Sequence, residues 1–375
     1  MLRQFPLNRL NRRWLAIRCD LAVVGGGPAG SSAALAAAKG GLSVVVLERR
    51  RIIGQPVQCA EYVPSGVSRW ARVSERAVAV STVALKTVLP GGEAVVTRAP
   101  GFVLRREIFD LELAERAAAA GARYVLEARA VLTSNDELRF KAQGREESVE
   151  ASLVLGADGP ASTVGRRLGR ESRVLDWAAG WGERRTVNWA VAAPEIHFHA
   201  EFPGGYAWIF PRGKETVNIG VAVERRKGDP RRGLSIFLNT LPRGFLAADP
   251  PLAAGGGLVP TGGMLPVLAR GKFFLAGDAA GLAHPVTGAG ILPALVSGTL
   301  AGRWAVIALG GRGPTALAGY CRELEGEVGR SLAWGKRKRM EMLAGWNGEK
   351  ETLRELVRRT WPMFPEYYAG SERGR

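Results

Sequence analysis

The 375-residue sequence contains little cysteine and little histidine, with three residues of each. Cys19, Cys59 and Cys321 are far apart and form no C-x-x-C pair, which argues against a disulfide framework and against a zinc site. The sequence also has no cysteine cluster for iron-sulfur ligation, which argues against the larger quinone-linked electron carriers. Reduced thiols in a cytoplasmic protein fit this composition best.

Acidic residues are also few, because 35 Asp and Glu stand against 52 Lys and Arg, for a formal charge of +17. Such an excess favours an acidic partner: an anionic membrane surface, nucleic acid, or a phosphorylated substrate or cofactor. General use of Arg in an Ala- and Gly-rich chain is the alternative. Residues 1–18 hold five arginines and no acid, with apolar residues near helical spacing. They predict a basic amphipathic extension that contacts a membrane, unless the start codon is assigned too early.

Formal charge is absent from residues 279–302, a stretch long enough to span a membrane if His284 is neutral. Two prolines, Pro285 and Pro293, and five glycines interrupt it. Such residues break a lipid-exposed helix, so the stretch predicts a buried loop that runs into a helix.

The first glycine-rich motif is "VVGGGPAG", in which Gly25, Gly27 and Gly30 form G-x-G-x-x-G after an apolar strand and before an Ala-rich helix. These glycines suit a tight turn, close approach of the backbone to a pyrophosphate, and close helix-strand packing. Glu48 ends the second strand, "SVVVLE", where a carboxylate binds ribose hydroxyls. The stretch therefore predicts a dinucleotide-binding βαβ unit.

A second glycine-rich site lies more than two hundred residues downstream, in "LAGDAAGLAHPVTGAGI". We expect a strand over residues 273–276, with Gly277 allowing close approach and Asp278 reaching ribityl hydroxyls. The segment with Gly288, Gly290 and Ile291 then begins a helix whose positive end faces a flavin ring. Because NAD is held largely within one Rossmann half, two distant sites favour FAD.

Alternation of strands and helices predicts an α/β fold with a Rossmann-type FAD-binding domain. Period-two alternation between Thr186 and Glu224 predicts an inserted, mainly antiparallel substrate sheet, and the chain becomes helical and basic after residue 291. The FAD-binding domain is expected over residues 19–80, 101–175 and 266–310. The substrate domain is expected over residues 81–100 and 176–265, between a basic extension (1–18) and a helical C-terminal region (311–375).

These motifs resemble those of the geranylgeranyl reductase family, within the glutathione-reductase-like flavoproteins that include para-hydroxybenzoate hydroxylase. Besides both glycine sites, "RREIFD" fits the family's R-x-x-F-D element through Arg106, and "GADGPASTVG" fits its G-A-D-G-x-x-S element through Asp158 and Ser162. The resemblance implies that Arg106 and Asp158 lie at the cofactor.

Two further details favour the reductases over the related hydroxylases. Gly281 and Leu292 stand where hydroxylases usually carry His and Asn. "YAWIFPRG" matches the reductases' Y-x-W-x-F-P element, which implies that Tyr206, Trp208 and Phe210 share one strand face and line the substrate cavity; ordinary core aromatics are the alternative. Related reductases often carry a cysteine near the flavin, so Cys59 is a candidate to orient substrate or supply a proton, or else a buried spectator.

The resemblance thus implies an FAD-dependent reductase that saturates carbon-carbon double bonds of an isoprenoid chain by hydride transfer. Its partners would be an isoprenoid or prenylated lipid, an electron donor left open among NADPH, NADH and ferredoxin, and an anionic membrane surface, but no nucleic acid. The location would be cytoplasmic, with peripheral attachment to the inner face of the membrane. An aromatic or quinone monooxygenase, a flavoprotein electron carrier and a binding module with degenerate flavin are the alternatives.

Three further groups of residues are expected to be structural. His197, His199 and Glu201 share the solvent face of an expected strand, so no metal site is predicted. His284 is expected to make a structural hydrogen bond. The basic run 336–339 is expected to be a solvated helix face, with binding of a phosphate head group or anionic lipid as the alternative.

Overall fold

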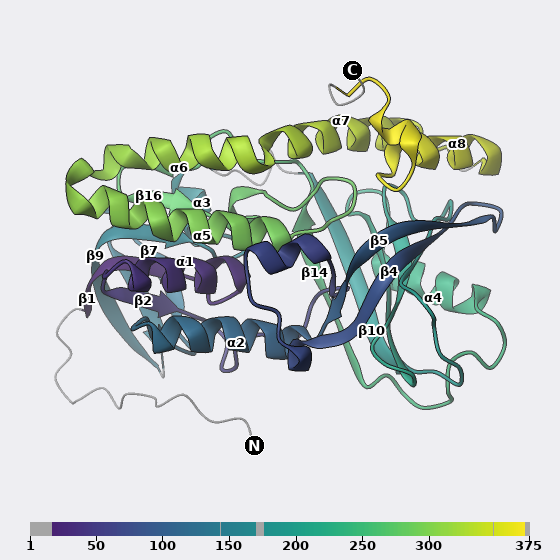
Figure 1. Cartoon of the computed structure of the whole chain (residues 1–375), viewed down its shortest axis with the longest axis horizontal. Coiled ribbons are helices and arrows are strands. Elements are labelled where there is room, and N and C mark those ends of the chain that lie inside the picture. The colour runs from purple at the N-terminus through teal and green to yellow at the C-terminus, as the bar shows by residue number, and fades with distance from the viewer. Residues whose placement is uncertain (1–16, 143, 170–175, 348, 372–375) are drawn as a thin grey trace.

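The computed structural model describes residues 17–142, 144–169, 176–347 and 349–371. These residues form two eight-stranded sheets and a helical region that runs along both (Figure 1). The α/β class expected from the sequence is confirmed. Apart from Ile17 and Arg18, the basic N-terminal extension lies outside the described residues.

The first sheet is mainly parallel, with strand order β15-β16-β9-β1-β2-β6, and β7 and β8 extend it through an antiparallel pairing with β9. Its parallel ladders join β1 to β2, β1 to β9, β9 to β16 and β2 to β6. Its strands are β1 (Ile17–Val24), β2 (Val44–Leu47), β6 (Arg123–Val125), β7 (Arg129–Leu132), β8 (Leu138–Ala142), β9 (Arg145–Gly156), β15 (Ala269–Arg270) and β16 (Phe273–Leu275).

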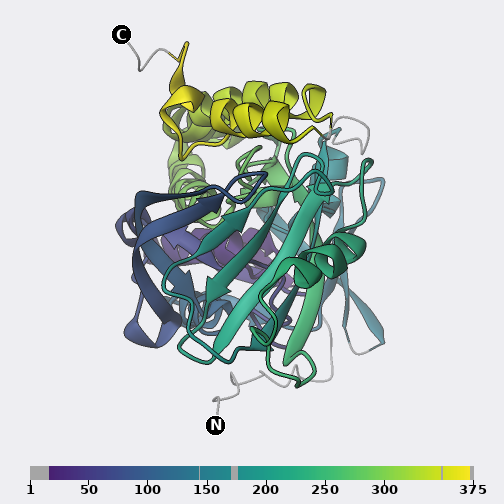
Figure 2. The same cartoon turned by 90° about the vertical axis from the view of Figure 1, so that its right-hand side faces the viewer.

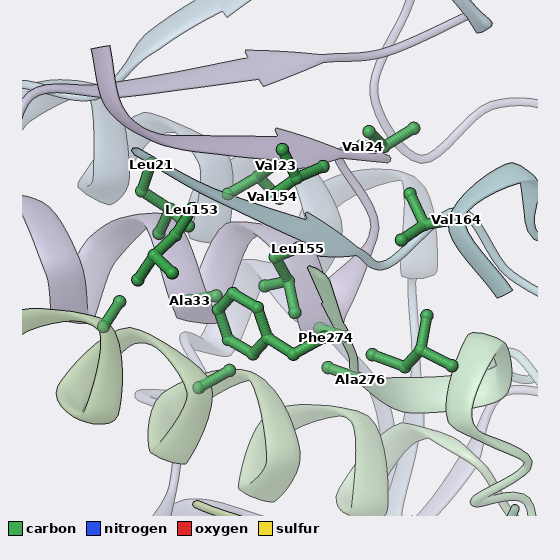
Figure 3. Close-up of a cluster of buried hydrophobic side chains, with 14 of the residues drawn as sticks. Leu21, Val23, Val24, Ala33, Leu153, Val154, Leu155, Val164, Phe274 and Ala276 are labelled. Atoms are coloured by element: carbon green, nitrogen blue, oxygen red, sulfur yellow. The ribbon is translucent and has the colours of Figure 1, made fainter. Parts of the chain in front are cut away.

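The central strands of this sheet are buried on both faces, as their continuous apolar runs predict. Figure 3 shows Leu153, Leu155 and Phe274 beside Ala33 of the neighbouring helix, in a cluster that contains no polar side chain among those drawn. This core fixes the carboxyl ends of β1, β9 and β16 at one edge, where the loops of interest begin.

The second sheet is mainly antiparallel, with strand order β14-β10-β13-β12-β11-β4-β5-β3, and one helix, α4, lies against it (Figure 2). Its one parallel pairing joins β11 and β4. Its strands are β3 (Tyr62–Pro64), β4 (Val78–Val88), β5 (Ala94–Leu104), β10 (Trp177–Thr186), β11 (Glu195–His197), β12 (Tyr206–Pro211), β13 (Thr216–Glu224) and β14 (Ala253–Pro260).

The C-terminal helices connect the two sheets, since α5 and α6 lie over the first and α7 and α8 extend over the second (Figure 1). The α-helices are α1 (Pro28–Lys39), α2 (Arg106–Ala119), α3 (Thr163–Arg167), α4 (Pro230–Thr240), α5 (Ile291–Ile307), α6 (Leu317–Leu324), α7 (Arg330–Ala344) and α8 (Lys350–Thr360).

Helices α1 and α5 are in backbone contact. A Cβ at Gly298 would stand 2.1 Å from the carbonyl oxygen of Ala29, and one at Gly302 would stand 2.3 Å from that of Ala33. In the described chain one helix, Ile291–Arg312, is long and apolar enough to span a membrane by length and composition, and 61% of its most apolar window is buried. Its contact with α1 accounts for this apolar character as core packing.

The sheets differ from the expected bounds at several points. Strand β3 falls within residues 19–80 but pairs with β5 of the second sheet. Strands β4 and β5 together extend beyond residues 81–100, because their pairing runs from Val78 to Leu104. The strand expected over residues 273–276 ends at Leu275.

The expected strand "EIHFHAEF" is also shorter than predicted, because it ends at His197 and the chain turns, with the Phe202 N–H donating to the carbonyl of His199. The prediction of one solvent-facing row is therefore wrong for His197, whose ring lies 5.0 Å from that of Phe237 and whose Nε2 is 2.9 Å from Glu195. His199 and Glu201 are exposed. No cluster of metal-binding side chains occurs within the described ranges.

Candidate active site

A continuous cavity of about 2330 Å³ lies between the two sheets and the C-terminal helices. It extends from the first glycine loop, past the second, to aromatic side chains of β12 and of the segment after α8. Fourteen of the fifteen site residues expected from the sequence line it: Gly25, Gly27, Glu48, Cys59, Arg106, Asp158, Tyr206, Trp208, Phe210, Gly277, Asp278, Gly288, Gly290 and Ile291. The exception is Gly30, which is packed inside the protein.

The three glycines of the first motif have three different environments. Gly25 has φ +102°, and a Cβ there would stand 2.4 Å from the Ala157 carbonyl oxygen. A Cβ at Gly30 would stand 1.9 Å from the Gly25 carbonyl oxygen, so this residue allows α1 to approach the turn. A Cβ at Gly27 would meet no heavy atom within 4 Å. Gly25 and Gly30 therefore allow close main-chain packing within the protein, whereas Gly27 faces the open cavity.

Glu48 is held beside this loop by the main chain. Its two carboxylate oxygens accept hydrogen bonds from the N–H groups of Gly26, at 2.7 Å, and Arg50, at 2.8 Å. The side chain is buried and borders the cavity. This fixed carboxylate at the end of β2 is suited to accept from the hydroxyls of a sugar.

Arg106 and Asp158 are each fixed by interactions with residues close to them in the sequence. The Arg106 guanidinium makes a bidentate pair with Asp110, at 2.8 Å for each contact, within the first turns of α2. Burial alone would lower the pKa of Arg106, but Asp110, Cys59 and Glu61 together more than offset this, so the pKa is raised. Asp158 accepts from the Ser162 hydroxyl and from the Thr163 N–H, which orders the turn before α3.

The second glycine loop follows β16 and leads into α5. Gly277 has φ +62°, and its N–H donates to the Ser297 hydroxyl at 2.9 Å. A Cβ at Gly277 would stand 2.9 Å from the Cβ of Ala29, so this loop touches the first turn of α1. Helix α5 begins at Ile291 without a side-chain cap, and its first residues line the cavity.

Side chains from two other elements hold the segment between Asp278 and α5. The Tyr206 hydroxyl donates to the Thr287 carbonyl, and Arg339 of α7 donates to the Pro285 carbonyl at 3.1 Å. His284 accepts from the Thr287 N–H at 3.3 Å, and burial lowers the pKa of His284 to about 4. His284 therefore has the structural hydrogen bond that the sequence analysis expected.

The aromatic residues of β12 come together at the other end of the cavity. The Tyr206 and Trp208 ring centroids are 6.5 Å apart, and Phe210 lies 6.0 Å from Tyr62. Trp208 and Phe210 are buried and pack in one cluster with Trp361, after α8. One face of β12 thus forms an aromatic wall.

Cys59 is a free thiol on this side of the cavity. Its sulfur accepts from the Glu61 N–H at 3.2 Å. Burial raises the pKa of the Cys59 thiol, and the positive charge of Arg106 opposes that rise. The thiol form is therefore favoured, while Arg106 and the Glu61 N–H are placed to stabilise negative charge on the sulfur.

Comparison with known proteins relates this geometry to a family. Residues 20–156 match the model for FAD dependent oxidoreductases, and residues 190–249 match that for the geranylgeranyl reductase catalytic domain. The digeranylgeranylglycerophospholipid reductase of Methanocella arvoryzae is 33% identical over 336 residues, which cover 84% of each chain. The digeranylgeranylglycerophospholipid reductase 1 of Methanopyrus kandleri is 35% identical over 307 residues, which cover 77% of this chain and 81% of its own.

The chain belongs to the geranylgeranyl reductase family of FAD-dependent oxidoreductases. The fold agrees, because a geranylgeranyl bacteriochlorophyll reductase-like protein from Thermoplasma acidophilum superposes with a TM-score of 0.81 at 24% identity, over 95% of this chain and 99% of its own. A flavin-dependent brominase shares the fold at a TM-score of 0.69 and 16% identity, over 88% of this chain and 89% of its own.

The residues of this reductase fit FAD along the length of the cavity. The open space at Gly27 lies where α1 begins, and the first turn of α1 carries no acidic residue. A helix N-terminus of this kind binds a pyrophosphate. Glu48 stands on one side of that space, and the second glycine loop borders the cavity further along.

Sequence reasoning missed several residues of the reductase that meet at this cavity. Glu61, Arg212 and Asn218 form a buried polar network beside Cys59, and Gly182 and Gly220 lie under Trp208. Weak signals were present: an acid two residues after Cys59, an amide within the apolar run "TVNIGVAVE", and glycines inside strands, where they often mark a close approach.

The prediction of a solvated basic helix face over residues 336–339 is confirmed for the first two residues of this run and wrong for the last two. Lys336 and Arg337 are exposed, but Lys338 and Arg339 are buried. Lys338 pairs with Glu341 at 3.1 Å, and Arg339 pairs with Glu224 of β13 at 2.6 Å. Arg339 therefore joins α7 to the second sheet and, through Pro285, to the second glycine loop.

Proposed function

We propose that this reductase saturates carbon-carbon double bonds in the geranylgeranyl chains of a glycerophospholipid. The observation that carries the proposal is the single cavity, in which the region suited to FAD continues to the aromatic wall of Tyr206, Trp208 and Phe210. An apolar, aromatic cavity of this kind suits a polyprenyl chain. The named glycerophospholipid reductases to which the chain is similar support the choice of head group.

Reduced FAD, when bound, supplies a hydride to one carbon of the alkene. The aromatic wall holds the alkene flat and excludes water, which keeps the reacting carbon near its hydride source. Cys59 supplies the proton to the neighbouring carbon, since burial keeps its thiol protonated. The thiolate that remains is stabilised by Arg106 and the Glu61 N–H until solvent returns a proton.

The reaction type is tested with enzyme whose flavin has been reduced chemically under anaerobic conditions. Mixing with a geranylgeranyl glycerophospholipid is expected to reoxidise the flavin, and the product should gain two hydrogens per reduced bond and no oxygen. Mass spectrometry of the lipid and flavin absorbance measure both results. Oxygen in the product of an aerobic reaction would instead favour a monooxygenase, and reoxidation of the flavin without any change in the lipid would favour an electron carrier.

We also propose a cytoplasmic location with peripheral attachment to an anionic membrane. The excess of positive charge and the exposed Lys336, Arg337 and Met340 on α7 support it, because basic residues beside apolar ones bind such surfaces. Arg339 of the same helix lines the cavity.

Sedimentation with vesicles that contain anionic lipid is expected to show binding that weakens with salt. Because each Lys or Arg near the surface contributes about 1 kcal/mol, reversing Lys336 and Arg337 to Glu removes at least about 2 kcal/mol, roughly 30-fold in affinity. Reversing the exposed Arg69 and Arg72 is the matched control, with the same change in net charge. Equal losses in both double variants, or equal binding to neutral vesicles, would contradict attachment through α7.

A further inference from the structure

We propose that Asn218 is a positioning residue that holds the Trp208 indole and the Cys59 main chain in a fixed relation across the cavity. The inference rests on the proposed function, in which the alkene lies against Trp208 and within reach of Cys59. Asn218 lies on β13, in register with Phe210 of β12, and is 9% exposed. Its amide group is placed between the aromatic wall and the thiol.

Three hydrogen bonds fix the orientation of this amide. Asn218 Oδ1 accepts from Trp208 Nε1 at 2.8 Å, while Nδ2 donates to the Cys59 carbonyl at 2.8 Å and to Glu61 Oε2 at 2.9 Å. An indole N–H can only donate, and a carbonyl or carboxylate oxygen can only accept. Rotating the amide by half a turn would lose all three bonds, so a single arrangement satisfies the buried groups.

Glycines on the neighbouring strands fix the rest of the indole. Trp208 is in register with Gly220 of β13, which is in register with Gly182 of β10. A Cβ at Gly220 would stand 2.2 Å from Trp208 Cζ2, and one at Gly182 would stand 2.9 Å from it. The ring therefore lies against the main chain of two strands, and Asn218 holds its one polar atom.

Glu61 anchors Asn218 to the other half of the protein. It is fully buried, and its carboxylate accepts from Arg212 at 2.8 Å as well as from Asn218. Arg212 also reaches Glu107 at 2.8 Å, and the Arg106 N–H lies 3.3 Å from Glu61 Oε1. The charged groups around the amide are thus Glu61, Arg212, Arg106 and Glu107, with the Cys59 thiol beside them.

Loss of Asn218 leaves the chain-binding surface in place but frees the indole and the loop of Cys59. The body of a polyprenyl chain still binds, so KM changes little. The alkene is no longer held at a reactive distance from both the hydride source and the proton donor, so kcat falls. This split between kcat and KM distinguishes positioning from loss of binding.

Asn218→Asp provides the first test, since an oxygen replaces Nδ2 at 2.9 Å from Glu61. Two carboxylates that share a site repel, which raises the pKa of the pair. With one proton on the pair, the carboxyl O–H donates to Glu61 and the other oxygen accepts from Trp208, while the bond to the Cys59 carbonyl is lost. We expect kcat to be highest at low pH, where the indole is held, and to fall by about tenfold per pH unit above the apparent pKa of the pair.

Asn188→Asp is the matched control, because its exposed amide donates to the Gly244 carbonyl far from the cavity. It should keep the wild-type pH profile. A folded, FAD-loaded Asn218→Asp enzyme with the wild-type profile would overturn the inference. If Asn218→Asp fails to fold, Trp208→Phe is the second test, because it removes the indole donor together with part of the ring. Its kcat should fall by roughly tenfold or more at unchanged KM, and a wild-type kcat would refute positioning.

A third measurement does not depend on the substrate. The Trp208 indole N–H signal in an NMR spectrum, assigned by its absence in Trp208→Phe, should exchange slowly with solvent in the wild type and at least about tenfold faster in Asn218→Leu. Unchanged exchange would overturn the proposed contact. Wild-type enzyme that reduces no isoprenoid lipid would instead defeat the proposed function, and the exchange result would still decide the role of Asn218.

Discussion

Gly27→Leu is expected to give a folded protein that no longer holds FAD. A Cβ at Gly27 would have no heavy atom within 4 Å, so the added side chain starts in open space beside the loop. It would occupy the space at the N-terminus of α1 where the pyrophosphate approaches the backbone. Losing two charge-assisted hydrogen bonds of about 1.5–3 kcal/mol each weakens FAD binding by roughly 10²- to 10⁴-fold. Titration of the apoprotein with FAD, followed by flavin fluorescence, measures this change.

Gly66→Leu is the matched control, since a Cβ at Gly66 also meets nothing within 4 Å and the residue is exposed outside the cavity. It should bind FAD as the wild type does. Gly30→Ala is expected to act differently, because its Cβ would stand 1.9 Å from the Gly25 carbonyl oxygen and the loop itself would have to move. Full FAD occupancy in folded Gly27→Leu protein would contradict the role assigned to the first glycine loop.

Trp208→Ala is expected to retain FAD and to lose alkene reduction. The indole is buried at the aromatic end of the cavity and fills the space above Gly182 and Gly220. Its removal widens the cavity where the alkene is held, and a displacement of about 1 Å at a reacting atom can cost roughly 10²-fold in rate. The same truncation costs about 3–5 kcal/mol of stability, so thermal unfolding must be measured beside kcat.

Trp189→Ala removes a half-exposed indole from the same domain outside the cavity. We expect kcat to stay unchanged and the loss of stability to be smaller, because only the packing on Phe245 is lost. Normal reduction of geranylgeranyl lipids by folded Trp208→Ala enzyme would mean that the aromatic wall does not hold the substrate. The proposed substrate would then have to bind elsewhere in the cavity.

Features set by short-range spacing could be predicted from the sequence. The order of strand, glycine turn, helix and Glu48 lies within about thirty residues, and each position follows from the geometry of a βαβ unit. The shared face of Tyr206, Trp208 and Phe210 follows from the period of two along a strand. Both patterns follow from the regular geometry of the backbone, so they can be recognised from the spacing of residues in the sequence.

Features that depend on pairing between distant segments could not be predicted in this way. Asn218 meets Glu61 across 157 positions of sequence, and Arg339 meets Glu224 across 115. Residue type alone suggested a solvated cation for Arg339, because Arg is seldom buried without a partner. The partners become visible only when the register of the second sheet and the position of α7 are known.

The backbone contact between α1 and α5 has a thermodynamic consequence for cofactor binding. Each helix begins at one of the two glycine loops, and Gly298 and Gly302 let them touch along their length. The separation of the loops is therefore set by the core before any ligand arrives, so FAD binding has little conformational entropy to overcome there. The fixed separation of the two loops also favours FAD over a mononucleotide flavin. A mononucleotide flavin lacks the adenylate half and is too short to contact both loops, and the packing of α1 on α5 keeps the loops apart.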